Sequence, residues 1–78
     1  GNEGVYGLQR AFKIAGVKYL IMSLWKVDDR STQAFMAEFY KQWLQGKQPI
    51  PEAFRAAQKS MRAKSPGAYD WAGFVLIE

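Results

Sequence analysis

The spacing of apolar positions divides this chain of 78 residues into successive segments. Between Glu3 and Ala15 the apolar residues recur every three or four positions, which is typical of an amphipathic helix. Gly16 follows as a helix stop, because glycine adopts the left-handed conformation at little cost. Residues 17–25 are almost continuously apolar, which predicts a strand that is covered on both faces.

A second helix is predicted over residues 30–44, ending before Gly46. Its inward arc would consist of six mostly aromatic residues, and helical spacing favours core packing over a partner groove for them: Phe35, Met36, Phe39, Tyr40, Trp43 and Leu44. A third helix is predicted to begin near Pro51. Proline suits the first turn of a helix, and Glu52 suits the positive end of its dipole.

The third helix carries an inward stripe of Phe54, Ala57 and Met61 and should break at residues 65–67, which read Ser-Pro-Gly. Residues 71–77 then form a second strand-like apolar run. Two strands alone make a marginal sheet, and strands that are apolar on both faces need neighbours on both edges. We therefore expect an α/β fold with an incomplete sheet, in the order helix, strand, helix, helix, strand. It would be the C-terminal part of a larger domain whose other strands lie upstream.

The composition narrows the possible functions. The chain contains no Cys and no His, so only carboxylates remain as metal ligands, and we expect neither a metal nor a cofactor. The absence of disulfides fits a reducing compartment, and the sequence shows no leader and no apolar run long enough to cross a bilayer. These features predict a cytoplasmic protein without membrane contact. The net charge of +4 permits an acidic partner without requiring one.

Asp28 and Asp29 stand where the first strand-like run ends. A buried strand that ends in paired carboxylates is a place where an α/β protein can receive a cationic ligand. The alternative is helix capping, because Asp28, Asp29 and Ser31 are all credible N-caps and an acid there offsets the helix dipole. Adjacent carboxylates repel each other, so a cation would relieve the site. That cation could be Arg30 or a substrate side chain, and the sequence leaves both interpretations open.

Arg55, Lys59 and Arg62 form a basic stripe on the third helix, at spacings of four and three. A nucleic-acid groove or an acidic partner could use such a stripe. No aromatic residue interleaves with these positions for base stacking, so a solvated helix face is the preferred interpretation.

Six segments, taken in order, carry a wider resemblance: Gly-Asn-Glu-Gly-Val-Tyr-Gly-Leu-Gln-Arg-Ala-Phe (1–12), Ala-Gly (15–16), Ser-Leu-Trp-Lys-Val-Asp-Asp (23–29), Phe-Tyr (39–40), Glu-Ala-Phe-Arg-Ala-Ala-Gln (52–58) and Trp-Ala-Gly-Phe-Val-Leu (71–76). Together they resemble the C-terminal part of a CHAT domain, a caspase-like domain usually found beside tetratricopeptide repeats. The resemblance covers essentially the whole chain, residues 1–78, as one partial domain. It implies the three-layer caspase–haemoglobinase fold.

Active members of that family are cysteine endopeptidases with a His–Cys dyad, and both residues would precede residue 1. Thiolate attack on a peptide carbonyl needs that Cys, so the chain alone should be inactive. The resemblance implies that Ser23, Leu24 and Trp25 bind the substrate backbone and shape the pocket for the residue before the cut. In separases a similar Leu-Trp-Asp-Val-Thr-Asp stretch receives an Arg side chain.

Asp29 matches the second acidic position of that stretch, and Asp28 falls on its Thr position. Lys26 replaces the first acidic residue, and a cation there weakens the negative field of the pocket and any strict preference for Arg. The resemblance thus assigns a substrate-pocket role to at least one of Asp28 and Asp29.

Three kinds of partner follow: a protein or peptide substrate, the upstream half of the CHAT domain with neighbouring tetratricopeptide repeats, and a second copy of the chain. Caspases dimerise through their last strand, so the apolar residues 74–77 predict self-association here. The alternative function is a non-catalytic interaction or scaffold module. Nucleic acid ranks below both, and neither nucleic acid nor a membrane is expected as a partner.

Overall fold

The computed structural model describes residues 18–64, 67 and 71–78. The helix predicted over residues 3–15, its glycine stop and the start of the first strand lie outside the described residues. In order, the described elements are strand β1 (Leu20–Ser23), helix α2 (Asp29–Tyr40), a π-helical segment η1 (Lys41–Gln45), helix α3 (Ile50–Lys64) and strand β2 (Phe74–Ile77). This order confirms the predicted strand, helix, helix, strand succession in the part of the chain that the structure describes.

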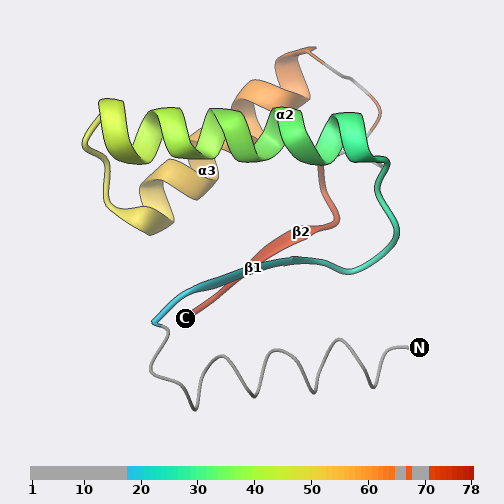
Figure 1. The fold of residues 1–78 in the computed structure, drawn as a ribbon, viewed down its shortest axis with the longest axis horizontal. Coiled ribbons are helices and arrows are strands. Elements are labelled where there is room, and N and C mark those ends of the chain that lie inside the picture. Colours follow the sequence, from blue (N-terminus) through green and yellow to red (C-terminus); the bar gives the residue numbers. More distant parts are fainter. Residues whose placement is uncertain (1–17, 65–66, 68–70) are drawn as a thin grey trace.

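The strands form one layer and the helices a second layer on one side of it (Figure 1). β1 and β2 pair antiparallel, with Leu20 opposite Ile77 and Ser23 opposite Phe74. Both strands are shorter than the apolar runs that predicted them, because the regular pairing ends at Ser23 and Phe74, next to a bend at residues 24–25 and a turn at residues 71–73. The α/β class with an incomplete sheet is confirmed.

The two faces of this sheet differ in their surroundings. Ile21 and Leu76 pack against the hydrophobic core. Side chains alternate along a strand, so their neighbours Met22 and Val75 lie on the opposite face. These neighbours are also apolar, and they are half-buried. The face that they share points away from the two helices.

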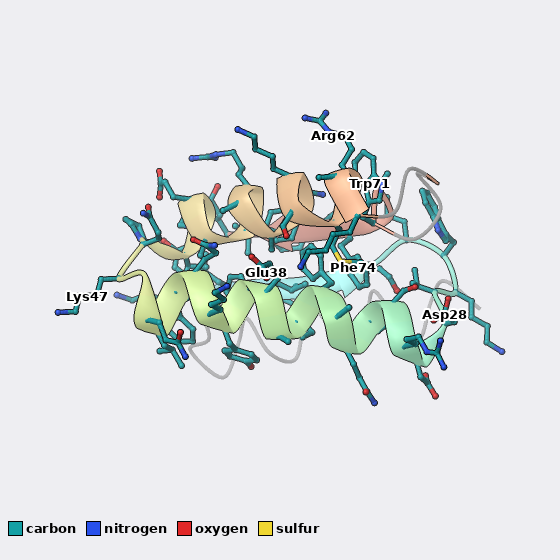
Figure 2. All side chains as sticks on the ribbon, turned by 90° about the horizontal axis from the view of Figure 1, so that it is seen from above. Asp28, Glu38, Lys47, Arg62, Trp71 and Phe74 are labelled. Atoms are coloured by element: carbon teal, nitrogen blue, oxygen red, sulfur yellow. The ribbon has the colours of Figure 1, made fainter. Side chains whose placement is uncertain are left out.

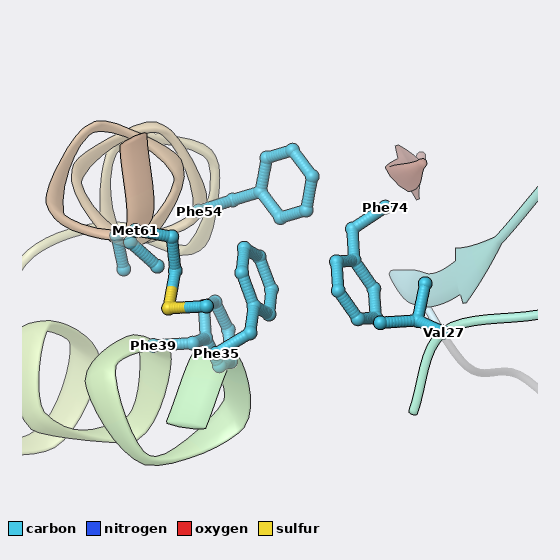
Figure 3. Packing of buried hydrophobic residues seen from close by; sticks show 8 residues of the cluster. Val27, Phe35, Phe39, Phe54, Met61 and Phe74 are labelled. Carbon is cyan, nitrogen blue, oxygen red and sulfur yellow. The ribbon is translucent and has the colours of Figure 1, made fainter. Parts of the chain in front are cut away.

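The core is centred on Phe35, whose side chain is fully buried. Its ring stacks on Phe74 at a centroid distance of 4.4 Å and meets the edge of Phe54 at 5.5 Å (Figure 3). Burial of a side chain of this size contributes about 1.5–3 kcal/mol, and each aromatic pair adds about 0.5–1.5 kcal/mol. Phe35 therefore joins α2, α3 and β2, and it fixes the last strand relative to the helices.

The predicted inward stripe of α3 is confirmed, since Phe54, Ala57 and Met61 are all buried. The predicted arc of the second helix is only partly buried. Phe35 and Phe39 lie in the core, whereas Tyr40 is 47% exposed and Leu44 is 61% exposed.

Leu44 lies in the π-helical turn η1, whereas Tyr40 is the last residue of α2 itself. An i→i+5 turn breaks the 3.6-residue periodicity from which the arc was predicted. Gly46 ends the segment as expected, and its N–H donates to the carbonyl oxygen of Lys41 at 2.9 Å. A Cβ atom at Gly46 would lie 2.7 Å from the carbonyl oxygen of Gln42, so a larger residue would not fit there.

Candidate functional site at the end of the first strand

Ser23, Leu24 and Trp25 lie where β1 ends. Ser23 is the last paired residue of the strand, opposite Phe74. Leu24 continues the contact between the strands, because its N–H donates to the carbonyl oxygen of Gly73 at 2.8 Å. Its side chain is 57% exposed, and that of Trp25 is 37% exposed. The end of β1 thus presents two large apolar side chains to solvent while its backbone is held by the residue before β2.

Trp25 is positioned by close contact with a glycine. An added Cβ atom at Gly73 would lie 2.6 Å from Cε2 of Trp25 and 3.0 Å from Cδ2 and Cζ2. The indole ring therefore lies directly against the Gly73 backbone, and only glycine leaves room for it. The sequence had shown Gly73 only as part of a family motif. A glycine inside an apolar strand-like run is the signal that could have indicated a close approach.

Asp28 caps helix α2. Its Oδ1 accepts a hydrogen bond from the backbone N–H of Ser31 at 2.7 Å, and its Oδ2 accepts one from the Ser31 hydroxyl at 3.1 Å. The backbone of Asp28 is extended, and its carbonyl oxygen accepts the N–H of Thr32 at 3.0 Å, as at a standard N-cap. The hydrogen bonds from Ser31 lower the pKa of the Asp28 carboxyl group below its ordinary value, and the bond from the backbone N–H has the largest effect.

Asp29 has different surroundings from Asp28. It is the first residue of α2 and is exposed, and its carboxylate makes no hydrogen bond or ion pair within the described part of the chain. Val27, immediately before the pair, is buried and anchors the loop in the core. The structure therefore separates the two acids: Asp28 satisfies the helix N-terminus (Figure 2), and Asp29 is left as the available negative charge.

An apolar cleft of about 250 Å³ opens between β1 and the second helix. It is lined by Tyr19 and Ile21 on the strand side and by Met36, Phe39 and Trp43 on the helix side, among others. A second, more polar cleft lies on α3 beside Trp71. Trp25, Asp28 and Asp29 line neither of these clefts. The predicted pocket residues thus share the end of β1 and the loop after it, and they lie outside both of these clefts.

Within the described ranges, no group of three or more acidic, His or Cys side chains is arranged to hold a metal ion. No helix in that same part of the chain is both long enough and apolar enough to span a membrane.

Comparison with known proteins identifies the family. The family model of the CHAT domain matches residues 1–78, so this chain belongs to the CHAT-domain family. The described elements are consistent with part of a caspase-like fold.

The chain is also similar to the human protein Tetratricopeptide repeat protein 28, with 36% identity over 96% of this chain, and to the mouse protein of the same name, with 33% identity over the same share. The chain spans 3% of the length of each of these relatives. No solved structure matches it.

Proposed function

We propose that this chain is the substrate-recognition portion of a caspase-like cysteine endopeptidase domain, whose catalytic Cys and His lie outside residues 1–78. The observation that carries the proposal is the end of β1. There Leu24 and Trp25 are exposed, and the Gly73 backbone holds both of them by a hydrogen bond and by close packing. A surface that recognises a peptide needs side chains that are both exposed and fixed in place, because exposed side chains bind a peptide tightly only if their positions are fixed beforehand.

In this proposal the chain contributes binding and orientation, and the upstream half contributes the chemistry. The cysteine thiolate would attack the scissile carbonyl and the histidine would transfer the proton. β1 pairs with β2 along one edge, and no described segment pairs with its other edge. The backbone groups of a free edge can bind another extended strand, so we assign this edge to the upstream half of the domain.

Asp29 is the proposed acidic group of the pocket. Both carboxylate oxygens of Asp28 already accept hydrogen bonds from Ser31, so Asp28 is a poor receiver for a substrate cation. Asp29 is exposed, and no described residue donates such a bond to its carboxylate. A Lys or Arg side chain of the substrate would pair with it, and the nearby Lys26 would weaken that preference.

The test uses the longer protein that carries this chain and fluorogenic peptides that differ only in the residue before the cut. Asp29→Asn should lower kcat/KM for Arg and Lys substrates by about fivefold, as expected for loss of one partly exposed ion pair, and leave a Leu substrate unchanged. Glu52→Gln is the matched control, because it removes an exposed carboxylate on α3 and should change neither. An unchanged Arg-to-Leu ratio in Asp29→Asn would limit Asp29 to a structural role.

The second candidate function is a non-catalytic scaffold module. It is supported by the name of the relatives, since tetratricopeptide repeats form extended binding surfaces in other proteins. Labelling of the intact protein with a thiol-reactive peptide probe separates the two functions. Stoichiometric labelling that a substrate peptide blocks supports the peptidase, and no labelling supports the scaffold.

Two further proposals concern partners and location. We propose that neighbouring tetratricopeptide repeats contact this domain and that β2 pairs with a second copy through its outer edge, as in caspase dimers. We also propose a cytoplasmic location, which is supported by the absence of Cys from the sequence.

A further inference from the structure

The outer side of α3 carries a cleft that combines positive charge with an aromatic ring. The cleft, of about 250 Å³, is lined by Arg55, Gln58, Lys59, Arg62 and Trp71. Figure 2 shows Arg62 beside Trp71 on the side of α3 that faces away from α2. The three cations are the basic stripe that the sequence had assigned to a solvated helix face. Trp71 and Gln58 line the cleft beside these cations.

The cations of this cleft are largely available to a ligand. Lys59 and Arg62 are exposed, and neither forms an ion pair with an acid in the described ranges. Arg55 pairs with Glu52 at 2.9 Å, but its side chain is 67% exposed, and such surface pairs are weak and easily exchanged. By contrast, Lys64 at the end of the same helix pairs with Glu38 of α2 and lies outside the cleft.

Two side chains fix the shape of the cleft. The guanidinium carbon of Arg62 lies 5.9 Å from the centre of the Trp71 ring, in a cation–π arrangement. Trp71 itself packs against the hydrophobic core. The amide nitrogen of Gln58 donates to the carbonyl oxygen of Phe74 at 3.2 Å, which ties the floor of the cleft to β2. The cleft is therefore supported by the core rather than formed by mobile side chains alone.

We propose that this cleft binds an acidic peptide segment, with carboxylates at alternate positions, from a partner protein. Residues at helix spacings of three and four have Cβ atoms about 5–6 Å apart, so the three cations form a row about 10 Å long. Alternate side chains of an extended peptide are spaced about 6.6 Å apart on one face, which matches this row. A single phosphate group would instead require cations that converge on one point.

The geometry disfavours single-stranded nucleic acid as the occupant. Binding of that kind depends on aromatic rings with an open face for base stacking. Among the described residues, Trp71 is the only aromatic one that lines this cleft, and it lies between the core and the Arg62 guanidinium. This inference does not depend on whether the domain is a peptidase, because the cleft and the end of β1 have no lining residue in common.

The test measures fluorescence anisotropy of a labelled peptide of alternating Glu and Ser with the longer protein that carries this chain. Saturable binding that weakens as salt rises is expected. Lys59→Gln and Arg62→Gln should each weaken binding by up to about fivefold, as for one exposed ion pair. Lys41→Gln removes an exposed cation outside the cleft and should leave the affinity unchanged. Circular dichroism confirms that each variant folds.

Several results would overturn the proposal. A Gln-Ser peptide that binds equally well would show that carboxylates are not recognised. An equal loss in Lys41→Gln would show that only the net charge matters. Tighter binding of oligothymidine, with the same dependence on Lys59 and Arg62, would make this surface a nucleic-acid site. A lack of saturable binding up to about 1 mM peptide would show that the cleft is an ordinary solvated surface.

Discussion

Replacement of Gly73 by alanine tests whether Trp25 is held as the structure shows. The new Cβ atom would lie 2.6 Å from Cε2 of Trp25, whereas ordinary contacts begin near 3.4 Å. The ring or the strand must therefore move by several tenths of an ångström. Overpacking of this kind costs about 1–3 kcal/mol. The backbone of Gly73 itself is not the obstacle, because its φ angle lies outside the left-handed region.

Gly73→Ala should stabilise the protein, rather than destabilise it, when the indole ring of Trp25 is absent. In a Trp25→Ala background the alanine at position 73 meets no indole ring, and the loss of backbone freedom in the unfolded chain should stabilise the protein by about 0.4–1 kcal/mol. Urea unfolding of the four proteins of this double-mutant cycle, followed by circular dichroism, gives the coupling energy between the two sites. Equal effects of Gly73→Ala in both backgrounds would refute the contact. A Gly73→Ala variant that loses activity together with Trp25→Ala would in addition support the recognition role.

Two further predictions concern the helix cap and the last strand. Asp28 has a lowered pKa in the folded protein, so the stability it contributes is present above its unfolded pKa and is lost as the pH falls below about 4. Asp28→Asn should keep the cap but reduce this acid-dependent loss of stability in thermal melts. Asp28→Ala should lower the melting temperature at neutral pH. The cap assignment would be contradicted if the melting temperatures of wild type and Asp28→Asn fell equally as the pH is lowered. Val75→Lys places a charge on β2 and should weaken self-association by about tenfold or more in sedimentation velocity, because edge charges block strand pairing. A wild-type protein that stays monomeric at high concentration would remove the basis for that prediction.

The helices were predictable because their signals are local. Helix ends are marked by the chemistry of one or two residues, here Asp28, Gly46 and Pro51. The observed bounds agree closely with them. Apolar spacing likewise identified the buried face of α3. The π-helical turn was not predictable from spacing, because a single widened turn leaves the pattern of residue types unchanged. It contains Leu44, which is exposed.

The candidate sites were less predictable, because they depend on contacts between residues far apart in the sequence. Nothing local to Trp25 indicates that its ring lies against Gly73. Similarly, the basic stripe acquires an aromatic wall only because Trp71 folds back beside Arg62. The acidic pair was located by sequence, but the different roles of its members follow from the bonds that Ser31 makes to Asp28 alone.

The chain leaves β1 for the helices and returns from them to β2 at neighbouring points. These points are held together by the hydrogen bond from Leu24 to Gly73 and by the strand pairing beside it. The exposed connection between η1 and α3, residues 46–49, lies at the far end of that excursion (Figure 1). We therefore expect natural variants to differ in the length of the helical hairpin there, without displacement of the strands. Positions 25 and 73 have no such freedom, and we expect them to change together or remain constant during divergence.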